Sequence, residues 1–188
     1  MSAGIYFLIM LVIIGVMVGL IIHFLKKKGT ETLFNACQDG DLRKAKSLIR
    51  NDPGLIDVYD PSGSTPLLVS VENGHLNIAE ILIYRGANVN MSGNLGVTPL
   101  HLAAERGFAD MVKLLIQKGA MVKAKDEMGA SPLHYAVEKG KADIVQILLE
   151  KGSDPGEVDN SGDSSLKIAV AKGRKDIIDM LKAQVSKE

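Results

Sequence analysis

A period of 33 residues runs through most of this chain and limits what it can fold into. Hydroxyl residues recur at this spacing, and glycines recur with them in two further registers. The positions are Thr65, Thr98, Ser131 and Ser164, then Gly74, Gly107, Gly140 and Gly173, then Gly63, Gly96, Gly129 and Gly162. Three landmarks that keep phase over four copies indicate a stack of equivalent structural units.

The landmarks predict the same two helices in every copy. In the copy TPLHLAAERG, Thr98 caps the first helix and Pro99 takes the first helical position, where a missing N–H has no cost. Gly107 ends that helix. The segment ADMVKLLIQK predicts a second helix with a broad apolar face, which Gly119 closes. The connector AMVKAKDEMG follows, in which Asp126 is expected to bond the backbone after it.

These segments together resemble a known repeat family. TPLHLAAERG, SPLHYAVEKG and TPLLVSVENG, with GANVN and the D-x-x-G turns between them, are similar to ankyrin repeats. An earlier partial copy, ETLFNACQDGDLRKAKSLI, aligns at an offset of 34, with Gly40 on Gly74, Leu42 on Leu76 and Leu48 on Leu82. The resemblance implies about five helix-turn-helix units, at about 31–60, 61–93, 94–126, 127–159 and 160–188.

The first and last units differ from the inner ones, as the end units of a solenoid do, because each presents one flank to water. The last copy, SSLKIAVAKGRKDIIDMLK, has Ser165 in place of proline and Lys167 in place of histidine. The first copy carries Arg43, Lys44 and Lys46. We interpret both as polar caps.

The N-terminus has a different composition from the repeats. No residue from Ala3 to Leu25 carries a fixed charge, and about 20 apolar residues are enough for a helix to cross a bilayer. A cleavable signal peptide needs a basic start, a shorter apolar run and a small-residue cleavage site, all of which are missing. We therefore predict an all-α ankyrin-repeat solenoid with short β-turn connectors over residues 29–188, preceded by one transmembrane helix and its basic flank over 1–28.

The charges after this stretch predict its orientation. Lys26, Lys27 and Lys28 follow directly, and a positive flank stays on the cytoplasmic side. The repeats of this single-pass protein are therefore expected in the cytoplasm. Gly15 and Gly19 have the small-xxx-small spacing of weakly self-associating transmembrane helices, although glycine is also common in such helices without that role.

Charge gives no indication of nucleic-acid binding. The three lysines belong to the 22 basic residues, so the repeats carry the other 19 against 22 acidic residues, a net charge of −3. There is no tryptophan, and no Arg-rich stretch is visible in the sequence. We therefore predict no nucleic-acid partner and no basic stripe for phosphates.

The histidines of the two TPLH-like segments raise the question of catalysis. Stacked helices would hold His101 and His134 about 8–10 Å apart, too far for one zinc ion with nitrogen ligands at about 2.0–2.1 Å. Leu68 and Lys167 occupy the matching positions in the neighbouring copies. In the family that the chain resembles, this histidine ties adjacent units together, and we predict the same here and for His75.

Other catalytic signatures are missing as well. The sequence has no G-x-S-x-G, no G-x-x-x-x-G-K-[ST], no HExxH and no pair of cysteines. The single cysteine, Cys37, is expected to be a buried thiol. We predict no catalytic residue, no metal and no cofactor; a hydrolase that uses His101 or His134 is the alternative that substitution can exclude.

What the resemblance implies instead is a protein-binding surface. In ankyrin proteins, the positions that vary between binders flank the D-x-x-G turn and precede the inter-helix glycine. Binding energy concentrates in a few aromatic, apolar and arginine side chains. We select Tyr59, Leu95, Arg106, Met128, Glu105 and Glu138. Gly93 replaces the connector aspartate found at Asp60, Asp126 and Asp159, which predicts a different tip there.

The predicted function is therefore a membrane-anchored, non-catalytic interaction module or scaffold that faces the cytosol and binds a protein partner. The alternative is the same fold exposed outside the cytoplasm, in a bacterial periplasm, as a protective or assembly factor.

Overall fold

The computed structural model describes residues 14–21, 30 and 32–185 of the 188-residue chain. Residues 14–21 and 32–39 are helical. The following helices are α2 (Leu42–Asn51), α3 (Pro66–Glu72), α4 (Leu76–Tyr84), α5 (Pro99–Arg106), α6 (Ala109–Gln117), α7 (Pro132–Glu138), α8 (Ala142–Glu150), α9 (Ser165–Ala171) and α10 (Lys175–Val185), with 3-10 turns η1 (Pro53–Leu55) and η2 (Asn94–Gly96). Within the described residues, β-structure is limited to one isolated bridge between Val158 and Ser164.

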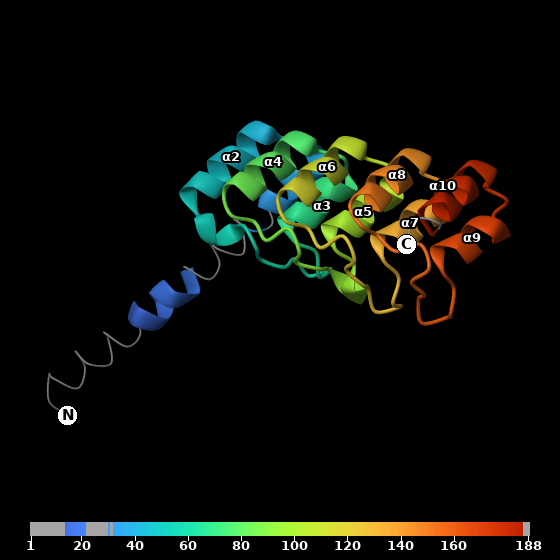
Figure 1. Ribbon diagram of the computed structural model, residues 1–188. Helices are drawn as coiled ribbons and strands as arrows, with labels where there is room; N and C mark the ends of the chain where they lie inside the picture. Colours follow the sequence, from blue (N-terminus) through green and yellow to red (C-terminus); the bar gives the residue numbers. More distant parts are fainter. Residues whose placement is uncertain (1–13, 22–29, 31, 186–188) are drawn as a thin grey trace, which may run out of the picture.

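The helices form two layers (Figure 1). The first helices of the units, α3, α5, α7 and α9, form the inner layer, and the second helices, α2, α4, α6, α8 and α10, form the outer layer. Each helix packs on its partner in the same unit and on the corresponding helices of the units beside it. The inner helices pack on one another more extensively than the outer ones, which places the inner layer on the concave side of the stack. This is the predicted all-helical solenoid.

The helix boundaries lie where the repeated landmarks predict them. Thr65 and Ser164 cap α3 and α9 by accepting a hydrogen bond from the backbone N–H three residues later, at 3.2 Å in both cases. Pro66 and its equivalents occupy the first turn. At the end of α5, Gly107 has φ +81°, a conformation that glycine adopts without strain. A Cβ there would also lie 2.8 Å from Cδ of Lys141 in the next unit, so glycine is required twice.

The core repeats with the same period. Leu67, Leu100 and Leu133 fill the inner layer, and leucines at corresponding positions of the outer layer are fully buried between the two layers. These outer leucines are Leu82, Leu115, Leu148 and Leu181. In the first unit, α2 begins at the predicted offset of 34, but Ile49 is buried and Leu48 only partly so. The predicted match of Leu48 with Leu82 is therefore right for the chain trace and wrong for burial, because this unit has no preceding repeat to pack against.

The predicted transmembrane span, residues 3–25, lies largely outside the described residues. Its described part, residues 14–21, is helical. Among the residues that the structure describes, no helix is both long enough and apolar enough to cross a bilayer.

Replacing Ser165 with proline is expected to stabilise the last unit. Ser165 is fully buried, and within the described structure its hydroxyl has no hydrogen-bond partner. It stands at the first helical position, after Ser164 in an extended conformation (φ −86°, ψ 159°) that proline tolerates in the residue before it. We expect Ser165→Pro to raise the free energy of unfolding by about 1 kcal/mol, through a less flexible unfolded chain and the loss of an unpaired hydroxyl. Urea denaturation would measure it; a lower midpoint would contradict the reading, and Ser165→Ala separates the hydroxyl from the ring.

Candidate functional site

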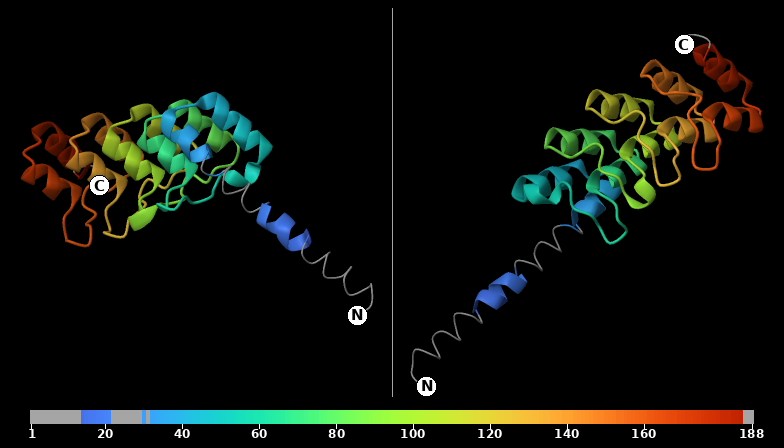
Figure 2. Two further views of the ribbon diagram at one scale, coloured as in Figure 1. Left: turned by 180° about the vertical axis from the view of Figure 1, so that it is seen from behind. Right: turned by 60° about the horizontal axis from the view of Figure 1, so that its bottom comes forward.

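The connectors between units project from one edge of the stack and form a row (Figure 2). Three of their tips are held by an aspartate, as predicted. Oδ1 of Asp126 accepts hydrogen bonds from the backbone N–H of Met128 at 2.9 Å and of Ala130 at 2.8 Å. Asp60 and Asp159 make the corresponding pairs of bonds. These tips are therefore rigid before any partner binds.

The tip at Gly93 is built differently. No carboxylate holds it; instead a 3-10 turn places Leu95 in the left-handed region, at φ 59° and ψ 18°. A Cβ at Gly93 would lie 3.0 Å from Cδ1 of Leu68 and 3.2 Å from the carbonyl oxygen of Gly63. Leu68 is the residue that replaces the repeated histidine. The two departures from the repeat therefore belong together, because leucine at one position occupies the space that a side chain at the other would need.

Neighbouring tips are also tied to one another. The hydroxyl of Tyr59 donates to the carbonyl oxygen of Ser92 at 2.9 Å. The N–H of Glu127 donates to the carbonyl oxygen of Leu95 at 2.8 Å, and that of Asn160 to Met128 at 2.9 Å. The row of tips is consequently one continuous, hydrogen-bonded surface.

The predicted apolar anchors lie on successive tips of this row. Tyr59, Leu95 and Met128 are 50 %, 61 % and 59 % exposed, which is unusual for side chains of this size. Tyr59 also lines a cavity of about 640 Å³ with Phe34 and Pro61, at the inner face of the first unit.

The predicted charged residues form a ladder of ion pairs that sequence reasoning missed. Arg106 contacts Glu72 at 3.1 Å, Lys139 contacts Glu105 at 3.1 Å, and Lys172 contacts Glu138. Each pair joins the ends of inner helices in successive units. The signal was a spacing of 34, one more than the period, which places opposite charges in adjacent units. Glu105 and Glu138 also line a cavity of about 260 Å³ beside Tyr135.

The two buried histidines link successive units, as predicted. Nε2 of His101 lies 3.1 Å from the carbonyl oxygen of Ala130, and Nε2 of His134 lies 3.2 Å from that of Asp163. Nδ1 of each ring accepts the backbone N–H of the capping residue, Thr98 or Ser131, at 3.2 Å. Because a carbonyl only accepts and an N–H only donates, each neutral ring carries its proton on Nε2. Both nitrogens of each ring are thus engaged.

The surroundings of His101 favour the neutral ring. Burial lowers the pKa of His101 below its ordinary value, against the hydrogen bond to Ala130 and the charge of Asp126. Tyr135 packs edge-on against the ring, with centroids 5.1 Å apart, and donates to Oδ2 of Asp126 at 2.8 Å. Burial and this hydrogen bond raise the pKa of Tyr135. The network joins two units and has no nucleophile in it.

The remaining sequence predictions concern His75 and Cys37. Nε2 of His75 lies 3.0 Å from the carbonyl oxygen of Gln38 in the preceding unit, so this ring also links units. Cys37 is fully buried, as expected, and burial raises the pKa of its thiol to about 11, against a hydrogen bond from Ser70. Cys37 is consequently a poor nucleophile.

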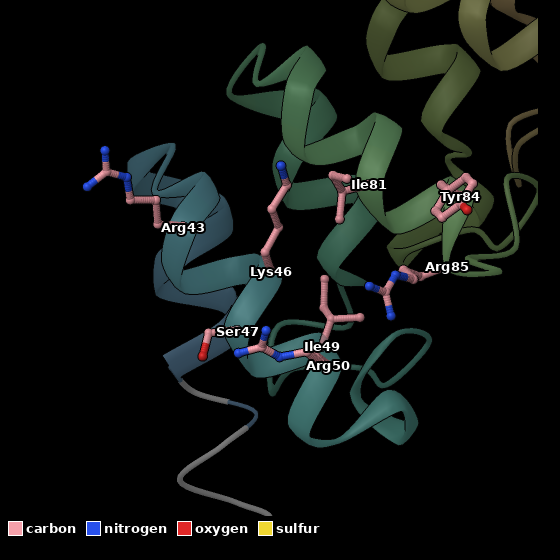
Figure 3. A pocket seen from close by; sticks show the side chains of 8 residues that line it. All are labelled: Arg43, Lys46, Ser47, Ile49, Arg50, Ile81, Tyr84 and Arg85. Carbon is pink, nitrogen blue, oxygen red and sulfur yellow. The ribbon is translucent and has the colours of Figure 1, made fainter.

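The outer face carries a basic cluster that the charge count did not reveal. Between α2 and α4 lies a cavity of about 380 Å³, and its lining includes Arg43, Lys46, Arg50 and Arg85 (Figure 3). The interpretation of the α2 charges as a simple polar cap was therefore incomplete, and the expectation that no basic patch exists is wrong for this face.

Comparison with protein families agrees with this architecture. A family model described as ankyrin repeats (3 copies) matches the chain over residues 8–93, 88–159 and 129–187. Proteins of this kind are generally non-catalytic protein-interaction modules. The period, the two helical layers, the capped helix starts and this match, which covers most of the sequence, together show that the chain belongs to the ankyrin repeat family.

Proposed function

We propose that this protein is a membrane-anchored scaffold that binds a protein partner on the cytosolic side through its row of connector tips. The observation that carries the proposal is the placement of Tyr59, Leu95 and Met128. These large side chains are at least half exposed, and their backbones belong to one hydrogen-bonded row. A rigid surface with apolar anchors loses little conformational freedom when it binds.

The ion-pair ladder borders this row and provides its charged rim. Its members are about half exposed, and exposed ion pairs of this kind contribute about 0.2–1 kcal/mol each. A partner can therefore exchange the contact between Arg106 and Glu72 for its own at small cost. Glu105 and Glu138 are available in the same way, which keeps all six predicted residues in the proposed surface.

The anchor is supported by the sequence. The uncharged stretch from Ala3 to Leu25 has the length that a bilayer requires, and the three lysines after it favour a cytosolic domain. Anchoring would confine the partner to the membrane and raise its effective concentration for a second contact there.

Site-specific photo-crosslinking tests the surface. Met128 and Met121 are a matched pair, since both are exposed methionines in the same connector, 59 % and 64 % exposed, and only Met128 lies at the tip. With a photoreactive residue at position 128 of the full chain, in cells of its own source, we expect a discrete protein adduct. At position 121 we expect none. Leu95→Asn, which suits the left-handed backbone but removes the apolar side chain, should abolish the adduct. Equal adducts at both positions, or no adduct at 128, would remove the proposed surface.

Topology requires a separate experiment. Protease added to intact spheroplasts should leave the repeats uncut if they face the cytosol, and lysis should expose them. Digestion before lysis would instead favour the periplasmic alternative.

A further inference from the structure

The basic groove on the outer face lies between two helices of different units. Arg43, Lys46 and Arg50 come from α2, and Arg85 directly follows α4 (Figure 3). Ser47 adds a hydroxyl, and Tyr84, at 82 % the most exposed large apolar side chain in the described structure, stands at the rim.

The charges of this groove are not neutralised by the protein. None of its four cations forms an ion pair within the described structure, whereas Arg106, Lys125, Lys139 and Lys172 on other parts of the solenoid all do. The lining contains no acidic residue, and α2 has none at all. Four unpaired cations therefore converge on one groove of a domain whose net charge is negative.

The chemistry of the lining matches a phosphate ester. Guanidinium and ammonium groups bind phosphate oxygens through charge-assisted hydrogen bonds, and a serine hydroxyl can add a neutral one. The exposed tyrosine has the character of the residues that lie at membrane–water interfaces, where an aromatic ring meets lipid and a hydroxyl meets water. A groove with both features fits the headgroup layer of an anionic bilayer better than it fits a free anion.

Position in the chain points to the same occupant. Helix α2 begins at Leu42, 14 residues after Lys28 at the end of the basic flank. A chain of that length spans about 50 Å at most, so a membrane anchor would keep the groove within reach of the lipid surface. We propose that the groove between α2 and α4 binds the phosphate headgroups of anionic phospholipids and thereby orients the solenoid on the membrane. This inference rests on the proposed anchor.

Fluorescence quenching in reconstituted vesicles tests this orientation. Asn77 is exposed on α4, one turn before Ile81 of the groove, and the buried Cys37 leaves an introduced Asn77→Cys as the thiol to label. The full chain is inserted into phosphatidylcholine vesicles that carry quenchers in their headgroups, with or without 30 % phosphatidylglycerol. We expect strong quenching only with the anionic lipid, and its loss in 1 M salt, which screens such contacts.

Matched variants assign the effect to the groove. Each basic residue near an anionic surface contributes about a fivefold change in binding, so Lys46→Gln with Arg50→Gln should weaken the quenched state roughly 30-fold. Lys118→Gln with Lys123→Gln removes the same charge from exposed lysines outside the groove and should change it little. Equal losses in both double variants would overturn the proposal, as would quenching that does not depend on phosphatidylglycerol.

Competitors identify other occupants. If poly-glutamate, a short duplex DNA or millimolar inorganic phosphate protects the groove from lysine acetylation while anionic vesicles do not, the groove is not a lipid site and the proposal fails.

Alkaline extraction of the same vesicles scores the anchor independently. A chain that resists extraction but shows no lipid-dependent quenching retains the anchor and refutes the groove. If the chain is extracted yet binds anionic vesicles through Lys46 and Arg50, the groove stands and the anchor is refuted.

Discussion

Alanine at position 101 is expected to lower the free energy of unfolding by about 2–4 kcal/mol. His101 is fully buried, and its ring satisfies the N–H of Thr98 and the carbonyl oxygen of Ala130. Truncation leaves both groups buried without partners, at about 1–3 kcal/mol for such a loss, and adds a cavity beside Tyr135. Equilibrium denaturation in urea would measure the change.

The matched control is His75→Ala. This ring also bonds a carbonyl oxygen of the preceding unit, that of Gln38, but the contact is exposed and water can replace it. We expect a loss below about 1 kcal/mol. Similar losses at positions 75 and 101 would show that burial of the network does not matter. An unchanged stability at position 101, accompanied by the loss of some hydrolytic activity, would restore the catalytic alternative.

The features that sequence predicted correctly are those that each unit encodes within itself. A hydroxyl residue before proline, a glycine after the helix and an aspartate in the connector act on backbone groups a few residues away, as the bonds of Thr65 and Asp126 show. Local chemistry of this kind repeats with the period and can be read from one copy. For the same reason, the replacement of aspartate by Gly93 was visible in advance as a different tip.

The features that sequence missed arise between units. The pair of Arg106 and Glu72 follows a spacing of 34 rather than 33, because the helices of adjacent units are offset by one position where these side chains meet. The link between Gly93 and Leu68 is a steric contact across the same kind of junction. Such contacts depend on how far apart the stacked helices lie, which no single repeat specifies.

The basic groove was hidden for a further reason. Arg50 and Arg85 are 35 positions apart, and the net charge of the repeats averages them with acidic residues on other faces. Only the packing of α2 on α4 brings them together. The groove lies on the outer layer, whereas the connector tips extend from the inner layer, on the opposite side of the stack (Figure 1). A solenoid whose outer face lies on lipid would therefore still present Tyr59, Leu95 and Met128 to a partner.

Alanine at position 115 is expected to destabilise the whole stack, by about 2–5 kcal/mol. Leu115 is fully buried in α6, which packs on α4, α5 and α8, so the resulting cavity lies at a central unit with a neighbour on each side. Leu181 occupies the corresponding position of α10 and is equally buried, but α10 packs only on α8 and α9. The same chemical change can thus be made at the centre and at the end of one solenoid.

The two substitutions should differ in how far their effects spread. In a stack held by contacts between neighbours, an end unit can open by breaking a single interface, whereas a central unit cannot open without breaking two. Leu181→Ala is therefore expected to speed hydrogen exchange in α9 and α10 while α3 to α8 keep their protection. Leu115→Ala should speed exchange in every unit. Equal effects on all helices from both variants would mean that the five units unfold as one body, and the fraying expected of a capped terminal repeat would then have to be abandoned.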